Sequence, residues 1–236
     1  MKTRIEEVVQ DIIASYEQMA GIALTQLNRL DRYMSGTSGL SLEETKKEIV
    51  ENEARIDKLE VLISDKFINS IVLYQPVASD IRKLVSIYRI TINLERVGDL
   101  VMNIFNSIEA IENTEEYKEM SAVILNMLLS GKSMVEKSLL SFTNSDKDYA
   151  VWTIKNDEVV DEMNRKLLIN SISKAKVSQK TREMLLSYVD LKNIITNIER
   201  IADHATNIAE ASIYSMQGTD IRHNWQNKEY PGDELI

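Results

Sequence analysis

The chain has 236 residues, of which 44% are hydrophobic and 28% charged, and it contains no cysteine, which excludes disulfides and thiolate metal sites. Its formal net charge of −9 argues against a nucleic-acid partner, because the phosphates of nucleic acid must be met by lysine and arginine. No stretch approaches the roughly 18 uncharged apolar residues of a membrane span, and the acidic, amphipathic start MKTRIEEVVQ differs from a secretory leader, so we expect a soluble cytoplasmic protein without membrane insertion.

Two long amphipathic helices are predicted at the start of the chain. Over residues 4–34, apolar side chains recur at steps of three and four, which is typical of a helix with one buried face. The motif SGTSG at residues 35–39 ends this helix. Ser41 with Glu44 three residues later forms a capping box, which predicts a second helix from there to about Tyr74.

A third helix is predicted over about residues 76–112. Gln75-Pro76 marks its start, because proline fits the first turn of a helix but disfavours helical geometry in the residue before it. The stretch from Pro76 to Arg82 has no clean counterpart at residues 180–186. It is part of a motif whose family resemblance, described below, implies a partner contact made by the first half of the chain alone.

Three further helices are predicted in the second half of the chain. They cover about 114–143 opened by Thr114, about 146–174 after Asn144 or Ser145, and about 178–217 capped by Ser178 and closed by Gly218. The remaining tail, 218–236, is polar and lacks periodicity, and we expect it to be partly disordered beyond Asn224. At the start of this tail, Asp220 and His223 could close a site or cap the end of the last helix, and the cap is the favoured interpretation.

An all-α fold of two tandem three-helix bundles follows from these six antiparallel helices and their short connections. The predicted division is 1–112 for the first bundle, 113–217 for the second and 218–236 for the tail. The third and sixth helices supply matching core stripes, which are Ile90, Leu94, Val97, Val101 and Ile104, and then Ile194, Ile198, Ile201, Ala205 and Ile208.

The two halves are related by an internal duplication with a constant offset of 104 residues. LERVGDLVMNI at residues 94–104 reappears as IERIADHATNI at residues 198–208. The same offset relates two sets of polar residues, which are Glu53, Asp57, Glu95, Asp99 and Asn103, and then Asp157, Asp161, Glu199, Asp203 and Asn207.

Within each half, these polar residues are predicted to form rows on neighbouring helices. At about 100° per residue, Glu95, Asp99 and Asn103 advance only about 40° at each step, so they follow one line along a helix, on the side away from the core stripe. Glu53 and Asp57 have the same spacing and form a matching row if the second helix lies beside the third. The acid rows are therefore expected on an accessible surface.

Four carboxylates that converge in this way repel one another, and each like-charge pair four residues apart costs about 0.2 to 0.5 kcal/mol. A set of ligands that offers only oxygen suits hard cations, namely magnesium, calcium, manganese, or iron in an oxygen-rich cluster. Two simpler interpretations remain open: acids four residues apart are common on solvated helix faces, and Arg96 and Arg200 offset part of the charge. His204 is predicted to be a polar surface residue rather than a ligand.

Four motifs resemble those of the PhoU family of phosphate-transport and phosphate-signalling regulators: QPVASDIRKL (75–84), LERVGDLVMNI (94–104), IERIADHATNI (198–208) and GTDIRHN (218–224). The resemblance extends over essentially the whole chain. It implies two three-helix bundles related by a pseudo-twofold axis, with multinuclear clusters of divalent or ferric ions (Fe, Mn, Mg or Zn) held by the two sets of acids. Glu60 has Asn164 as its counterpart in the repeat, so if Glu60 is also a ligand, the two sites are expected to differ in charge.

The resemblance further implies a non-enzymatic, cytoplasmic negative regulator. Such a protein links the ATP-hydrolysing subunit of a phosphate importer to a sensor histidine kinase, and we expect it to be a homodimer. Three alternatives are weighed against this function: a ferritin-like di-metal oxidase, an accessory protein of a sodium–phosphate transporter, and a purely structural helical scaffold. The oxidase requires Glu-x-x-His pairs, which this chain with its two histidines lacks.

Overall fold

The computed structural model describes the backbone of residues 4–36, 39, 41–111, 114–174 and 181–222. For residues 114–119, 167–174 and 181–188 the description covers the backbone alone. The predictions that fall on Ser178, on His223 and on the tail beyond Asn224 therefore lie outside the described residues.

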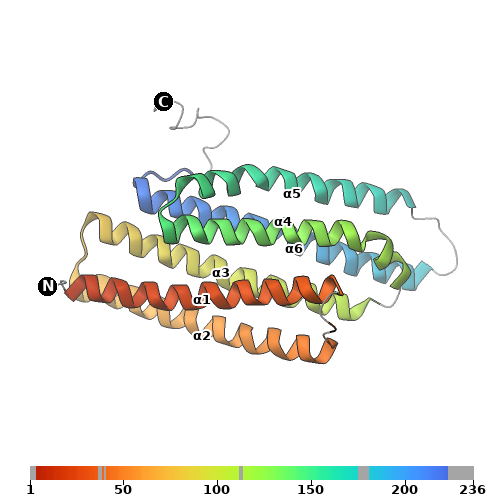
Figure 1. The fold of residues 1–236 in the computed structure, drawn as a ribbon, viewed down its shortest axis with the longest axis horizontal. Helices are drawn as coiled ribbons and strands as arrows, with labels where there is room; N and C mark the ends of the chain where they lie inside the picture. Colours follow the sequence, from red (N-terminus) through yellow and green to blue (C-terminus); the bar gives the residue numbers. More distant parts are fainter. Residues whose placement is uncertain (1–3, 37–38, 40, 112–113, 175–180, 223–236) are drawn as a thin grey trace.

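The described residues form six long helices and no strands, which confirms the all-α prediction. The helices are α1 (Arg4–Met34), α2 (Leu42–Tyr74), α3 (Ala78–Ala110), α4 (Thr114–Asn144), α5 (Lys147–Lys174) and α6 (Thr181–Gln217). Figure 1 shows them as long, roughly parallel rods that run along the length of the molecule. Within the described residues, no helix combines the length and the apolarity that a bilayer span requires.

The capping predictions for α2 and for the end of α6 are confirmed. Ser41 accepts a hydrogen bond from the backbone N–H of Glu44, whose side chain accepts one from the Ser41 backbone, so both halves of the capping box are present. At the end of α6, Gly218 has a φ of 72°, and its N–H donates to the carbonyl of Tyr214 at 2.9 Å. Glycine adopts this left-handed conformation without steric cost.

Helix α3, predicted over about 76–112, begins two residues later, at Ala78. Gln75 ends α2 in a left-handed conformation with a φ of 46°, and Val77 is extended, with a ψ of 152°. Pro76 therefore lies in a short link between the helices, and α3 begins at Ala78. The link is set by the left-handed Gln75, which the sequence pattern did not indicate.

Helix α5 begins at Lys147, close to the predicted start at about residue 146, and Asp146 caps it. The carboxylate of Asp146 accepts hydrogen bonds from the backbone N–H groups of Asp148 at 2.9 Å and Tyr149 at 3.4 Å. Asn144 is the last residue of α4, and Ser145 turns the chain with a φ of 53°. The next residue, Asp146, has a side chain suited to capping and caps the helix.

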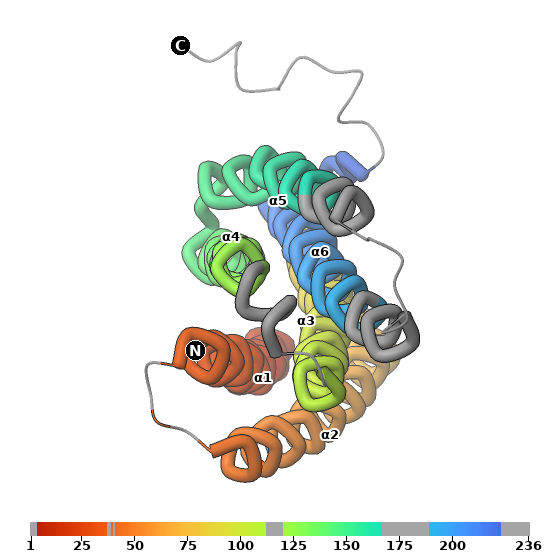
Figure 2. The backbone as a smooth tube through the Cα atoms, turned by 90° about the vertical axis from the view of Figure 1, so that its right-hand side faces the viewer, coloured from red at the N-terminus to blue at the C-terminus, as the bar shows by residue number. Residues whose placement is uncertain are grey.

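Three helices pack against one another in each half of the chain, α1 with α2 and α3, and α4 with α5 and α6. Figure 2 shows the two groups end-on, with α3 and α6 next to each other at the centre. Helix α1 also packs on α4, where Lys132 Nζ lies 2.6 Å from Asp31 Oδ2. The halves are thus joined along their length through two helix pairs.

The predicted core stripes of α3 and α6 are fully buried. They belong to a single continuous hydrophobic cluster to which all six helices contribute. The two repeats are therefore related by sequence and geometry, but they share one core.

Candidate functional site

The first row of acids lies along the contact between α2 and α3. Glu53 and Asp57 come from α2, and Glu95, Asp99 and Asn103 come from α3. Glu53, Glu95 and Asp99 are half-buried, whereas Asp57 and Asn103 are exposed. The carboxylates of Asp99, Asp57 and Glu95 all lie near enough to Glu53 to interact with its charge. The structure thus brings the four predicted acids of the first repeat together.

The environment of Glu53 disfavours its charged form. Burial raises the pKa of its carboxyl from 4.5 to about 7, and the neighbouring carboxylates add to this rise, while a hydrogen bond from Gln26 opposes it. The environment of Glu95 has the same effect, because burial and the charge of Asp99 raise the pKa of its carboxyl. An added cation would relieve both effects.

Gln26 of α1 holds Glu53 in place. Its side chain is fully buried, and its amide nitrogen donates to the carbonyl of Ile49 at 3.1 Å and to Glu53 Oε2 at 2.9 Å. Opposite, Gly98 of α3 leaves room for this carboxylate, since a β-carbon at residue 98 would stand 2.5 Å from Glu53 Oε2. Helices α1 and α3 therefore fix the position of an acid carried by α2.

The second row repeats this arrangement between α5 and α6. Asp157 and Asp161 come from α5, and Glu199, Asp203 and Asn207 come from α6. Burial raises the pKa of Asp157 to about 6, and the charges of Asp203 and Asp161 raise it further. Burial, followed by neighbouring carboxylates, also raises the pKa values of Glu199 and Asp203. The four predicted acids of the second repeat therefore lie together as well.

Arginine offsets part of the negative charge, as the sequence suggested. Arg96 Nε lies 3.5 Å from Glu95 Oε2, and Arg96 Nη1 lies 3.4 Å from Asp99 Oδ2. In the second repeat, Arg200 lowers the pKa values of Glu199 and Asp203 against the larger effect of burial. Because the pKa values of Glu95, Glu199 and Asp203 remain raised, the arginines do not cancel the unfavourable environment.

The two repeats differ at one position, Glu60 in the first and Asn164 in the second. Glu60 adds a fifth carboxylate, whose charge contributes to the raised pKa of Glu95. Asn164 is buried, and its amide nitrogen donates to Glu199 Oε2. The same position therefore adds a repelling charge to one acid row and a hydrogen-bond donor to the other.

The seam between α3 and α6 passes beside both acid rows. His204 Nδ1 lies 2.8 Å from Asn93 Oδ1, and the histidine is half-buried. Burial lowers the pKa of His204, and Arg96 and Arg200 lower it further. The prediction of a surface histidine is wrong, because α3 of the other repeat covers this face of α6.

The oxygen donors fit a hard cation in chemistry but do not form a complete site. Among the described residues, no group of three or more histidine, aspartate or glutamate side chains converges closely enough to hold a metal ion. Two buried carboxylate oxygens, Glu53 Oε1 and Asp157 Oδ1, have no hydrogen-bond partner, and they occupy equivalent positions in the two repeats. Buried polar atoms without partners are rare in folded proteins, so these two require an explanation.

Gln26 and Gly98 were not singled out from the sequence. Gln26 carried a readable signal, because a long polar side chain interrupts the apolar stripe of its helix between Ala23, Leu27 and Leu30. Gly98 carried a weaker one, since its counterpart in the repeat is Ala202 and the glycine is not required by a turn. Asn93, which pairs with His204, had none.

Comparison with known proteins matches both repeats to one family. The family model of the PhoU domain matches residues 16–108 and again residues 119–212. A "Phosphate-specific transport system accessory protein PhoU homolog" from Aquifex aeolicus is 38% identical over 184 residues, covering 76% of this chain and 80% of the relative. The protein of the same name from Pseudomonas aeruginosa is 27% identical over 218 residues, covering 91% of this chain and 86% of the relative.

Solved structures of two related proteins share the fold. The crystal structure of PhoU from Pseudomonas aeruginosa superposes with a TM-score of 0.73 at 23% identity, covering 92% of this chain and all of that one. The phosphate transport system regulatory protein PhoU from Streptococcus pneumoniae gives a TM-score of 0.71 at 20% identity, covering 92% of this chain and 99% of that one.

Proposed function

This chain belongs to the PhoU family, and we propose that it is a regulatory accessory protein that lowers phosphate uptake and phosphate-starvation signalling. The observation that carries this proposal is the family match over both repeats, because the relatives are named as accessory proteins of phosphate-specific transport systems. The role is non-enzymatic. It agrees with relatives that are named as accessory proteins of a transport system.

The acid rows are proposed to bind metal ions. In the first repeat the ligands are Glu53, Asp57, Glu95, Asp99 and Asn103, and in the second they are Asp157, Asp161, Glu199, Asp203 and Asn207. The raised pKa values and the two buried oxygens without partners support this assignment. A hard cation bound there would neutralise the carboxylates and hold α2 against α3 and α5 against α6.

The proposed partners are the ATP-hydrolysing subunit of the phosphate importer and a sensor histidine kinase. The long helices offer extended docking faces, and the net charge of −9 favours basic partner surfaces. Because an ATP-hydrolysing subunit works on the cytoplasmic side of the membrane, this role places the protein in the cytoplasm, where we expect a homodimer.

Deletion of the gene tests the regulatory role. In phosphate-rich medium, the deletion strain is expected to express a phosphate-starvation phosphatase reporter constitutively, and the wild-type gene supplied in trans should restore repression. A reporter that stays repressed in the deletion strain would count against the assignment. A pull-down from the organism's own membranes at high phosphate then identifies the partner, and recovery of a sodium–phosphate transporter instead of the importer would favour that alternative.

A further inference from the structure

An exposed apolar surface lies at the end of the molecule where α2 meets α3. Val72 and Leu73 in the last turn of α2 and Val77 in the link are 66%, 68% and 72% exposed, and Ile81 in the first turns of α3 is 36% exposed. We call these four residues the α2–α3 tip. A group of large apolar side chains exposed in one place is typical of a binding surface, whereas scattered single ones are not.

The backbone of the tip adds a second feature, the N-terminal end of α3, which has no side-chain cap. Val77 is the N-cap residue and provides no side-chain hydrogen bond to the first turn. The first N–H groups of a helix and the helix dipole favour negative charge near such an end. Asp80 in the first turn supplies one negative charge. Gln75 and Ala78 on either side of the link both have positive φ, at 46° and 22°, which is strained for residues other than glycine.

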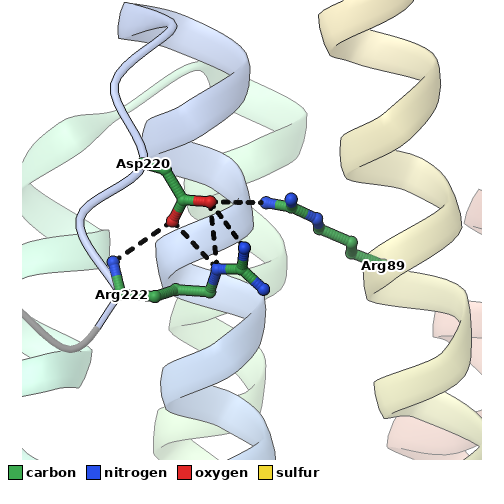
Figure 3. Close-up of polar contacts among 3 residues, drawn as sticks. All are labelled: Arg89, Asp220 and Arg222. Carbon is green, nitrogen blue, oxygen red and sulfur yellow. Dashed lines mark hydrogen bonds and ion pairs between the residues drawn. The ribbon is translucent and has the colours of Figure 1, made fainter.

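The segment that follows α6 is held against the same helix. The side chain of Arg82 lies beside Gly218, where a β-carbon would stand 3.2 Å from Arg82 Cδ. Asp220 Oδ2 lies 3.5 Å from Arg89 Nη1 of α3 and 2.6 Å from Arg222 Nη2. Figure 3 shows the carboxylate of Asp220 between the two arginines. Asp220 therefore ties the chain to α3 instead of capping α6, which corrects the prediction made for it.

Residues 223–236 begin within reach of the tip. Arg89 and Val77 are twelve positions apart on α3 and its cap, which at 1.5 Å per residue is about 18 Å. The eight steps from Arg222 to Tyr230 can extend to about 26 Å. Tyr230 and the residues after it can therefore reach the tip across the span of about 18 Å.

The composition of this tail complements the tip. Tyr230, Leu235 and Ile236 are apolar, and Asp233 and Glu234 lie directly before the last two of them. The apolar residues of this sequence fit the exposed valine and leucine side chains of the tip. Its acidic residues fit the positive end of the α3 dipole and the nearby Arg82. We propose that residues 230–236 of this chain dock on the α2–α3 tip and cover it.

This inference gives a role to the stretch from Pro76 to Arg82, which the second repeat lacks. The inference concerns the isolated chain, and it is independent of the proposed metal sites and of the regulatory role.

Disulfide trapping in the full chain tests the docking, because the chain has no cysteine of its own. Gly232→Cys places a thiol in the tail without removing an apolar residue. It is combined either with Ser79→Cys, an exposed position at the tip, or with Ile92→Cys, an exposed position three residues beyond Arg89. Under mild oxidation, the disulfide between residues 79 and 232 within one chain should form at least tenfold faster than that between 92 and 232.

The control position makes the comparison decisive, since Ile92 lies nearer to the anchored Arg222 than Ser79 does. A free tail would therefore react with residue 92 at least as fast as with residue 79, and this result would overturn the proposal. Disulfides that form only between chains would overturn it in favour of a second copy at the tip. Adding Leu235→Ser and Ile236→Ser should slow the 79–232 reaction at least tenfold, and an unchanged rate would show that these residues do not dock.

Discussion

Gly98 lies so close to Glu53 that a β-carbon on residue 98 would stand 2.5 Å from Glu53 Oε2. The same oxygen accepts a hydrogen bond from Gln26 at 2.9 Å. Glu53 is therefore confined between a buried amide on α1 and a residue of α3 that has no side chain. The absence of a side chain at residue 98 is what allows a carboxylate to occupy the contact between α2 and α3.

Gly98→Ala should bring no gain in stability while Glu53 is present. Alanine in the middle of a helix is normally more stable than glycine by about 0.5 to 1 kcal/mol, but here the new methyl group displaces the carboxylate from Gln26. In a Glu53→Ala background the obstacle is gone, and the full gain should return. Urea unfolding of the four proteins of this double-mutant cycle, with chelator present, measures the difference.

Gly21→Ala provides the matched control for this cycle, because Gly21 lies inside α1 with no neighbouring atom within 4 Å of the added carbon. It should stabilise the protein by about 0.5 to 1 kcal/mol whether or not Glu53 is present. Equal gains from Gly98→Ala in both backgrounds would show that residue 98 does not constrain Glu53.

Because of Glu53, the free energy of unfolding of the metal-free protein should decrease as the pH rises from about 5 to about 7. Its pKa rises from 4.5 in the unfolded chain to about 7 in the folded protein, so the folded state binds more protons in this interval. Stability then decreases as the pH rises through it. Glu53→Gln should reduce the decrease by about 1 to 2 kcal/mol, a range that allows for partial solvent exposure.

Unfolding free energies at pH 5 and pH 7.5 provide the comparison. Glu51→Gln, two residues earlier on the exposed face of α2, controls for the loss of one negative charge. If wild type and Glu53→Gln lose the same stability between the two pH values, the environment of Glu53 is not as unfavourable as its burial indicates.

Much of the fold could be predicted from local sequence patterns. The six helices follow from apolar residues at steps of three and four, and Ser41 with Glu44 marks a helix start through contacts within four residues. Helix ends were less predictable where several neighbouring residues can act as a cap, as with Asn144, Ser145 and Asp146 before α5. The left-handed Gln75 has no sequence signature.

The acid rows could be predicted because the duplication repeats them at a fixed offset. The residues that surround the acid rows could not be predicted, because they come from helices that are distant in sequence. The partner of His204 is Asn93, 111 residues earlier, and the partner of Glu53 is Gln26 on a different helix. Helical periodicity places a residue on a face, but it does not say which side chain of another helix will meet it.

The two repeats should respond differently when Glu60 and Asn164 are exchanged for each other's residue type. Asn164→Glu removes the donor to Glu199 and adds a like charge beside it, which should destabilise the metal-free protein by about 2 to 3 kcal/mol. Glu60→Asn removes a charge that repels Glu95, so its effect should stay within about 0.5 kcal/mol. Urea unfolding at pH 7.5 measures both.

Asn164→Gln separates charge from size, because it lengthens the side chain by the same amount and keeps the amide. It should cost at least 1 kcal/mol less than Asn164→Glu. Equal losses in the two variants would attribute the effect to the volume of the longer side chain and not to the repulsion of Glu199.

Asp99→Asn and Asp203→Asn should together abolish metal binding. Each change removes one carboxylate from the middle of an acid row, and a hard cation depends on the charge and number of its oxygen ligands. Protein purified without chelator is expected to carry several divalent or ferric ions per chain by elemental analysis, and each single variant should lose the ions of its own repeat. Glu51→Gln and Glu158→Gln, which change exposed acids outside the rows, should retain the full complement. Metal at background level in both the wild type and the double variant would leave the rows as solvated helix faces and favour the scaffold interpretation.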